Sequence, residues 1–120
     1  MSMIDTGFTR TLARFLDVNA LRHQLIVSNL ANIDTPGYRT QDIDFSRELE
    51  RAAGEIDYPG LQPVARSVRG LMERPDGNNV SVDRESLLLA ETQLRFQTGI
   101  QLLRAEFRRL ATAINGGGSQ

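Results

Sequence analysis

Apolar residues at the start of the chain recur with the spacing of an amphipathic helix. Within residues 3–33 most of them lie three or four positions apart: Ile4, Phe8, Leu12, Phe15, Val18, Leu21, Leu25, Ile26, Leu30 and Ile33. This spacing places apolar side chains along one face of an α-helix. No proline interrupts the pattern, so we expect one long N-terminal helix within residues 1–33.

A second apolar pattern, near the C-terminus, is stricter. Eight positions alternate at intervals of four and three residues: Leu89, Gln93, Phe96, Ile100, Leu103, Phe107, Leu110 and Ile114. Such an alternation is the heptad seam of a coiled coil, and only Gln93 is polar in it. Asp83 is expected to cap this helix, and the glycine run at 116–118 is expected to end it. The pattern therefore predicts a heptad helix at residues 84–115 with a helix-pairing seam, followed by a flexible tail at 116–120.

The middle of the chain, residues 34–83, breaks both patterns. It holds all four prolines of the chain and has turn chemistry at Pro75-Asp76-Gly77. Residues 45–52 suit a short helix, and residues 64–71 suit a short strand. Because this segment has too few apolar residues for its own core, we expect a Pro/Gly-rich extended arm and loop. The predicted fold class is mainly α: two long terminal helices, paired as an antiparallel coiled coil, with an irregular middle segment.

Four leucines of the C-terminal helix fall outside its heptad seam. They occupy heptad positions b and c, and are Leu87, Leu88, Leu94 and Leu102. A helix that packs only through its seam carries polar residues at these positions. Two explanations stay open. The leucines pack beneath the middle segment of the same chain, or they form an intersubunit face, since exposed apolar patches usually mark interfaces.

Composition argues against catalysis and against nucleic-acid binding. The chain has no cysteine and one histidine, His23, so no Ser/His/Asp set, no Cys/His set and no multi-histidine metal site can be assembled. Asp42 and Asp44 are expected on the polar face of an extended stretch. The ends of the chain are mildly basic and the middle is acidic, without a clustered basic face. We predict no enzyme activity, no cofactor or metal, no nucleic-acid partner and no membrane span.

Residues 28–38 read SNLANIDTPGY. This segment resembles the N-terminal signature N-[LI]-A-N-x-[DNS]-T-P-G-[YF] of the bacterial flagellar rod, hook and hook-associated axial proteins. The residues that carry the match are Asn29, Leu30, Ala31, Asn32, Thr35, Pro36, Gly37 and Tyr38. A second segment, DGNNVSVDRE at residues 76–85, resembles an element of the short rod proteins in that family. From residue chemistry alone, Pro36 and Gly37 suit the centre of a type II turn that ends the first helix.

The resemblance implies a structural subunit rather than an enzyme. Proteins of this family are exported unfolded by the flagellar type III apparatus, without a cleaved signal peptide, and polymerise helically. A proximal rod member would lie in the periplasmic part of the basal body and transmit torque from the membrane ring to the hook. The implied partners are other copies of the chain, FlgC-like rod proteins, the rod adaptor FliE, the membrane-ring protein and the export apparatus.

The helical pattern by itself leaves a rival function. A soluble helical adaptor or export chaperone would bind a partner helix along the seam, but it would need a stable fold with an open groove. The signature segment and the second apolar face favour the rod subunit. The thin core of two helices also predicts that the isolated chain is only marginally folded.

Overall fold

The computed structural model describes residues 7–53 and 63–117, which form three helices and two short strands. Along the chain these are α1 (Gly7–Ala31), β1 (Gln41–Ile43), α2 (Phe45–Ala53), β2 (Ala65–Ser67) and α3 (Val82–Gly117). The molecule is elongated, with extents of 71 × 27 × 18 Å.

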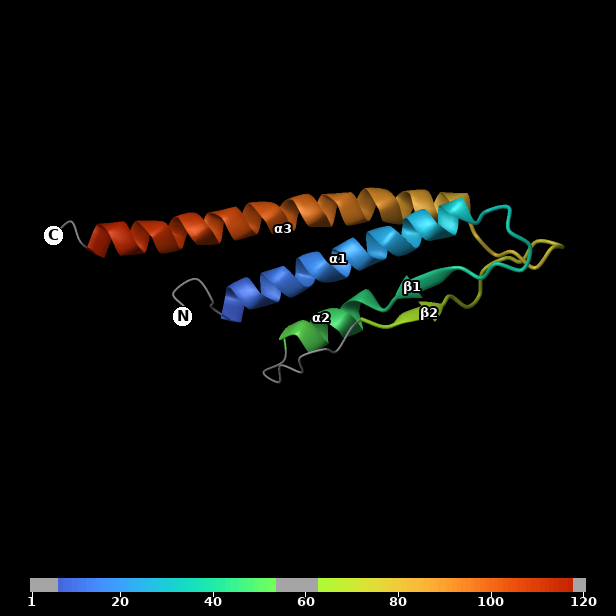
Figure 1. Ribbon diagram of the computed structural model, residues 1–120, viewed down its shortest axis with the longest axis horizontal. Helices are drawn as coiled ribbons and strands as arrows, with labels where there is room; N and C mark the ends of the chain where they lie inside the picture. The colour runs from blue at the N-terminus through green and yellow to red at the C-terminus, as the bar shows by residue number, and fades with distance from the viewer. Residues whose placement is uncertain (1–6, 54–62, 118–120) are drawn as a thin grey trace.

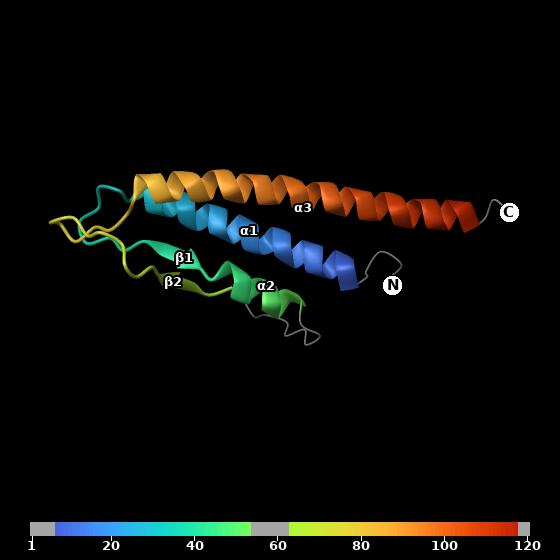
Figure 2. The ribbon, with the colours of Figure 1, turned by 180° about the vertical axis from the view of Figure 1, so that it is seen from behind.

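The two terminal helices run in opposite directions and lie side by side. Figure 1 and the reverse view in Figure 2 show α1 packed along α3, with the middle segment against the other side of α1. The fold class is confirmed: the protein is mainly α, its long terminal helices are paired antiparallel, and a short helix and a two-stranded sheet lie between them.

The ends of α3 differ from the prediction. Its N-cap is Ser81, whose hydroxyl accepts a hydrogen bond from the backbone N–H of Arg84 at 3.2 Å. The expected cap, Asp83, lies instead in the first turn, where its carboxylate favours the positive end of the helix dipole. At the other end α3 continues to Gly117, so the glycine run lies partly inside the helix. Residues 118–120 of the predicted tail lie outside the described residues, as do residues 1–6 and 54–62.

The side of α3 that faces α1 is rotated from the predicted seam. Its most buried residues lie seven apart: Glu85, Thr92, Gly99 and Glu106. Four predicted seam residues are half-buried beside this row: Leu89, Ile100, Leu103 and Leu110. Four are exposed in the single chain: Gln93, Phe96, Phe107 and Ile114. The helix pair therefore has small or polar residues along its contact line and apolar residues at its margins, and the part that the exposed seam residues play in assembly stays a prediction.

Glu106, at the far end of this row, is paired within α3. Arg109 donates two hydrogen bonds to its carboxylate, at 2.9 and 2.8 Å. These hydrogen bonds, with the attraction of the two charges, lower the pKa of Glu106 and raise the pKa of Arg109. Glu106 is therefore not an isolated charge beside α1.

Gly99 marks a close approach of the two helices. A Cβ atom at this position would lie 2.8 Å from Leu16 Cδ2 and 3.0 Å from Phe15 Cε2. Any side chain at position 99 must therefore displace these residues of α1. Glycine in a helix interior costs about 1 kcal/mol relative to alanine, and the close packing explains why it stands here.

Replacing Gly99 with leucine is expected to destabilise the protein by about 1–3 kcal/mol, the usual range for overpacking. The matched substitution is Gly116→Leu in the same helix, because a Cβ at Gly116 meets no atom within 4 Å. Both changes replace a glycine of α3 with leucine, so Gly116→Leu controls for the loss of a helical glycine without the clash. Urea unfolding followed by circular dichroism measures both, and an equal effect at the two glycines would contradict the close approach.

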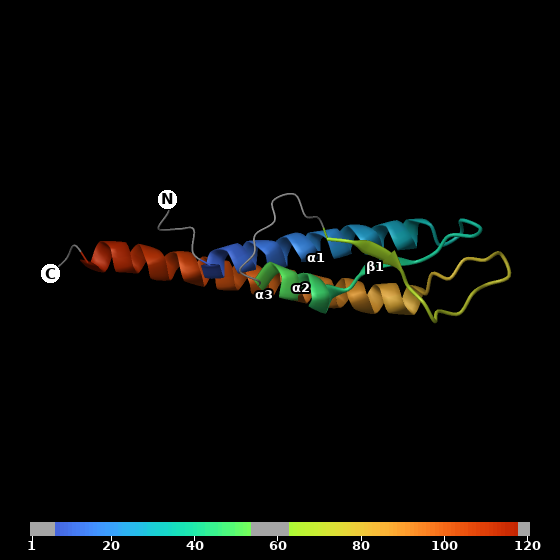
Figure 3. The same cartoon turned by 90° about the horizontal axis from the view of Figure 1, so that it is seen from below.

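The middle segment folds back along α1 as an arm, which we define as residues 38–53 and 63–81 (Figure 3). β1 and β2 pair antiparallel, with Ile43 opposite Ala65. Ile43 and Phe45 are buried together with Val18 of α1. The rings of Phe15 and Phe45 meet edge to face at 5.8 Å. The arm thus takes its apolar core from α1 of its own chain.

Candidate functional site

The two signature segments, far apart in sequence, meet at one end of the helix pair. In Figure 1 this is the end where the chain leaves α1 and returns to α3. We call this junction the clasp and define it as residues 28–42 and 74–85. Several of its polar residues are almost completely buried: Asn29, Thr40, Asn78, Asn79 and Glu85. Most buried polar groups in proteins are hydrogen-bonded, and the hydrogen bonds of these residues define the geometry of the clasp.

The proline–glycine pair forms the turn that the sequence predicts. The backbone N–H of Tyr38 donates to the carbonyl of Thr35 at 3.2 Å, and Gly37 has a φ of 75°. Both are features of a type II turn with Pro36 and Gly37 at its centre. The N–H of Gly37 then donates to the carbonyl of Asp76 at 2.8 Å, which joins the turn to the second signature segment.

Asn29 is the centre of the first half of the clasp. Its amide nitrogen donates to Glu85 Oε1 at 2.8 Å and to the carbonyl of Gln41 at 2.9 Å. Its amide oxygen accepts from the Tyr38 hydroxyl at 3.1 Å and from the N–H of Gln41 at 3.0 Å. One side chain therefore joins α1 to the turn, to β1 and to α3, and engages both its donors and its acceptor.

Asn78 satisfies the carbonyl end of α1 from the second signature segment. Its amide nitrogen lies 2.9–3.0 Å from the carbonyl oxygens of Asn32, Ile33 and Thr35. Carbonyls at a helix C-terminus lack hydrogen-bond donors within the helix, so the Asn78 amide supplies a donor to the carbonyls that follow α1. Arg74 donates a further hydrogen bond to the carbonyl of Ile33.

Asn79 holds the start of β1. Its side-chain oxygen accepts from the N–H of Thr40 at 2.7 Å, and its carbonyl accepts from the Thr40 hydroxyl at 3.2 Å. Its own N–H donates to the carbonyl of Tyr38 at 3.3 Å. The two adjacent asparagines thus bind different parts of the first signature: Asn78 binds the helix end, and Asn79 binds the chain that leads into the arm.

A network of charges extends from the clasp onto both helices. Asp42, 8% exposed, accepts two hydrogen bonds from Arg22 at 3.1 Å and one from Arg84 at 2.7 Å. Arg84 also donates to Glu85 at 2.7 Å, and Glu85 is completely buried. Two carboxylates are matched by two guanidinium groups, which bind β1 to α1 and α3 at once. Removal of one partner would leave the others poorly compensated.

The same side of the arm contacts α3 through Phe45. The guanidinium of Arg95 lies 4.4 Å from the centre of the Phe45 ring, and that of Arg22 lies 5.7 Å away. Cations at these distances are attracted to the face of an aromatic ring. The arm is therefore tied to both terminal helices by charge as well as by burial.

The predicted signature residues all lie in the clasp, but they differ in burial. Asn29 is buried and Tyr38 half-buried; Asn32 accepts a hydrogen bond from Thr35 at 3.0 Å. Leu30 is half-buried, and Ala31, Thr35, Pro36 and Gly37 are exposed. Sequence reasoning missed the charge network, and the expectation for Asp42 was wrong: it is buried against two arginines instead of lying on a polar face. No local pattern in the sequence indicates this network, because Arg22 and Arg84 are both distant from Asp42 along the chain.

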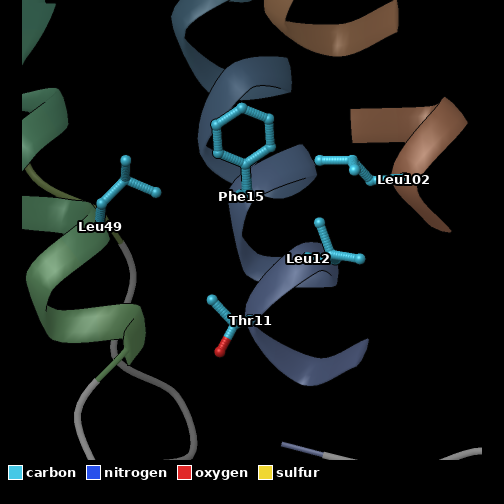
Figure 4. A pocket seen from close by; sticks show the side chains of 5 residues that line it. All are labelled: Thr11, Leu12, Phe15, Leu49 and Leu102. Carbon is cyan, nitrogen blue, oxygen red and sulfur yellow. The ribbon is translucent and has the colours of Figure 1, made fainter. Parts of the chain in front are cut away.

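The four leucines proposed as an intersubunit face do not share one environment. Leu87 and Leu94 are 68% and 65% exposed, whereas Leu88 is half-buried. Leu102 is exposed in part and lines a cavity of about 300 Å³ with Leu49 of α2 (Figure 4). The remaining lining residues are Thr11, Leu12 and Phe15 of α1. The cavity is thus lined mainly by apolar side chains and offers no charged group to a polar ligand.

Titratable residues form no candidate metal centre in the parts of the chain that the structure describes. No group of three or more histidine, aspartate or glutamate side chains gathers there in a way that could hold a metal ion. Among the described helices, none is both long and apolar enough to cross a membrane.

The structure thus defines a paired-helix protein with leucines exposed on α3 and a buried polar clasp at one end. No family model matches the chain. It is 37% identical to the flagellar basal body rod protein FlgB of Cereibacter sphaeroides, over 92% of this chain and 98% of that protein. The corresponding protein of Salmonella typhimurium is 30% identical over 85% of this chain and 88% of its own length. That of Escherichia coli is 27% identical over the same shares.

The chain therefore belongs to the FlgB family of flagellar basal body rod proteins. The resemblance carried by the two signature segments is confirmed at this level. The structure adds that these segments bind each other, so the most recognisable parts of the sequence are two halves of one junction.

Proposed function

We propose that the protein is a structural subunit of the bacterial flagellar basal body rod. Membership of the FlgB family supports this function. The paired terminal helices suit a subunit that packs lengthwise against its neighbours. An adaptor or export chaperone receives no support from the relatives, whose names all describe a rod protein. We propose no catalytic role for the chain.

The structural support for this proposal comes from one surface of α3. Between positions 86 and 102, every exposed residue of α3 is uncharged: Ser86, Leu87, Ala90, Gln93, Leu94, Phe96, Gln97, Thr98, Gln101 and Leu102. We call this surface the uncharged face of α3. The charged residues of the stretch, Glu91 and Arg95, are half-buried and paired at 2.9 Å. Solvated helix faces carry charges, whereas the centres of protein interfaces are depleted of them.

The finer features of the proposal are those that the family resemblance implies. The subunit belongs to the proximal, periplasmic part of the rod, and its terminal helices build the inner wall of a helical drive shaft that transmits torque to the hook. Its neighbours are other copies, FlgC-like rod proteins, the adaptor FliE and the membrane-ring protein. The flagellar type III apparatus exports it without a cleaved signal peptide.

The proposal is tested by fractionation of flagellated cells that produce an epitope-tagged chain in place of their own. The tagged protein is expected to co-purify with detergent-extracted basal bodies, because an assembled rod subunit resists extraction. A cell strain that lacks the basal-body membrane ring provides the control, in which the protein should leave that fraction. A wholly cytosolic protein in motile cells would contradict the function.

A further inference from the structure

α1 has an outward face of its own. The exposed residues from position 13 to position 31 are Ala13, Asp17, Ala20, His23, Gln24, Val27, Ser28 and Ala31. Asp17 carries the only formal charge among them. The arm does not cover this face, because it packs against Val18, Leu21 and Leu25. Val27 is 49% exposed, and Phe8, further toward the N-terminus, is 51% exposed. This face is therefore a second charge-poor surface with exposed apolar side chains.

The outward faces of α1 and α3 carry rows of exposed residues with the same seven-residue repeat. Leu87 and Leu94 lie one heptad apart on α3, about 10.5 Å along the helix axis, and project from it. Ala13, Ala20 and Val27 have the same seven-residue repeat on α1. Small side chains let a second helix come close, so a row of leucines can pack against a row with alanines at equal spacing.

The chain already uses this type of packing internally. Phe15 and Leu16 of α1 lie over Gly99 of α3, where the Cβ of any other residue would clash. Bulky side chains of one helix thus fill the space left by a small residue on the other. A contact between the outward faces of two copies would repeat the arrangement with the roles exchanged, because the bulky residues would then belong to α3.

Symmetry distinguishes two possible contacts between copies of the chain, α3 with α3 and α3 with α1. If the uncharged face of α3 bound the same face of another copy, the contact would be isologous and would stop at a dimer. Contact between α3 of one copy and α1 of another is heterologous, so each added copy leaves a free surface for the next. A rod is a continuing assembly, and the heterologous contact is the one that can continue.

We propose that Leu87 and Leu94 on the uncharged face of α3 pack against Ala13, Ala20 and Val27 on α1 of a second copy of the chain. This inference rests on the proposed function, because it names the partner of a surface that the rod proposal assigns to assembly. The few charges on either face lower the free energy needed to remove water from the contact.

The absence of cysteine from the native chain makes a disulfide test direct. Leu87→Cys or Leu94→Cys is co-expressed with Ala13→Cys, Ala20→Cys or Val27→Cys on a second, tagged copy, in cells whose own gene is deleted. Combinations that restore motility contain assembled rods. Their isolated basal bodies are oxidised, and covalent dimers are separated by non-reducing electrophoresis. A disulfide requires Cα atoms about 4.4–6.8 Å apart, so the pairing also reports the register.

We expect a covalent dimer of the two variants in at least one combination and none in cells with either variant alone. Ser46→Cys, an exposed position of α2, paired with Leu94→Cys is the control and should stay monomeric. A dimer formed by Leu94→Cys alone would show an isologous contact and overturn the inference. So would basal bodies that contain both variants without any cross-link, although the rod function would then stand, because the protein is present in the isolated rods.

Discussion

Changing Leu87 and Leu94 together to aspartate is expected to abolish rod assembly and motility while the isolated chain keeps its fold. Both side chains are about two-thirds exposed, at 68% and 65%, so the folded monomer loses little burial. Surface substitutions of this kind change stability by about 0.5 kcal/mol or less. In a packed contact, by contrast, each substitution removes about 1.5–3 kcal/mol of leucine burial and introduces a charge into a contact with few charged groups on either face.

Two measurements separate assembly from folding. Basal-body fractionation reports assembly, and circular dichroism with thermal unfolding of the purified chain reports the fold. The double variant Leu87→Met and Leu94→Met keeps an apolar side chain of similar volume at both positions, and it should assemble normally. The two aspartates could lower the helix content of the purified chain as strongly as they lower the amount of protein in the basal-body fraction. In that case the leucines stabilise the fold of the single chain rather than its contacts with other copies.

Changing Asp42 to alanine is expected to cause the largest loss of stability, about 3 kcal/mol or more, as breaking a buried ion pair does. Arg22 and Arg84 would lose the carboxylate between them, and their side chains are only 12% and 25% exposed. The arm would lose its ion pairs with both helices. Urea unfolding gives the change in free energy, and hydrogen exchange of the arm amides shows whether β1 opens first.

The matched comparison is Asp44→Ala, two residues away. Asp44 is exposed and caps α2, where its carboxylate accepts from the N–H of Arg47 at 3.2 Å. Loss of an N-cap costs about 1 kcal/mol, so Asp44→Ala should be clearly milder than Asp42→Ala. Equal losses would mean that the two arginines find other partners, and that the charge network does not hold the arm.

The helices were predictable because their signals are local and repeated. The 4–3 alternation located α3, and the Pro36–Gly37 pair located the turn after α1. The rotation of α3 was not predictable from hydrophobicity, because the buried row contains Glu85, Thr92 and a glycine. Such residues become acceptable at a helix contact only through partners elsewhere, as Asn29 and Arg84 are for Glu85.

The two segments that form the clasp could be predicted from the sequence, but the contact between them could not. Each signature segment could be recognised by its residues, but nothing local indicates that Asn78 binds the carbonyl end of α1. Asp42 illustrates the same limit, because both of its arginine partners come from distant helices. Polar contacts between distant segments leave no periodic pattern in the sequence, whereas apolar faces do.

The clasp also bears on how quickly the chain folds. Its hydrogen bonds join residues far apart in sequence: 56 positions separate Asn29 from Glu85, and 46 separate Asn32 from Asn78. Helices form within about a microsecond, but these hydrogen bonds form only after the long loop between their partners has closed. Chains dominated by such distant contacts fold slowly. A subunit that leaves the cytoplasm unfolded, as proposed here, gains from this delay, because the late step of its folding is the one that fixes its helices in register.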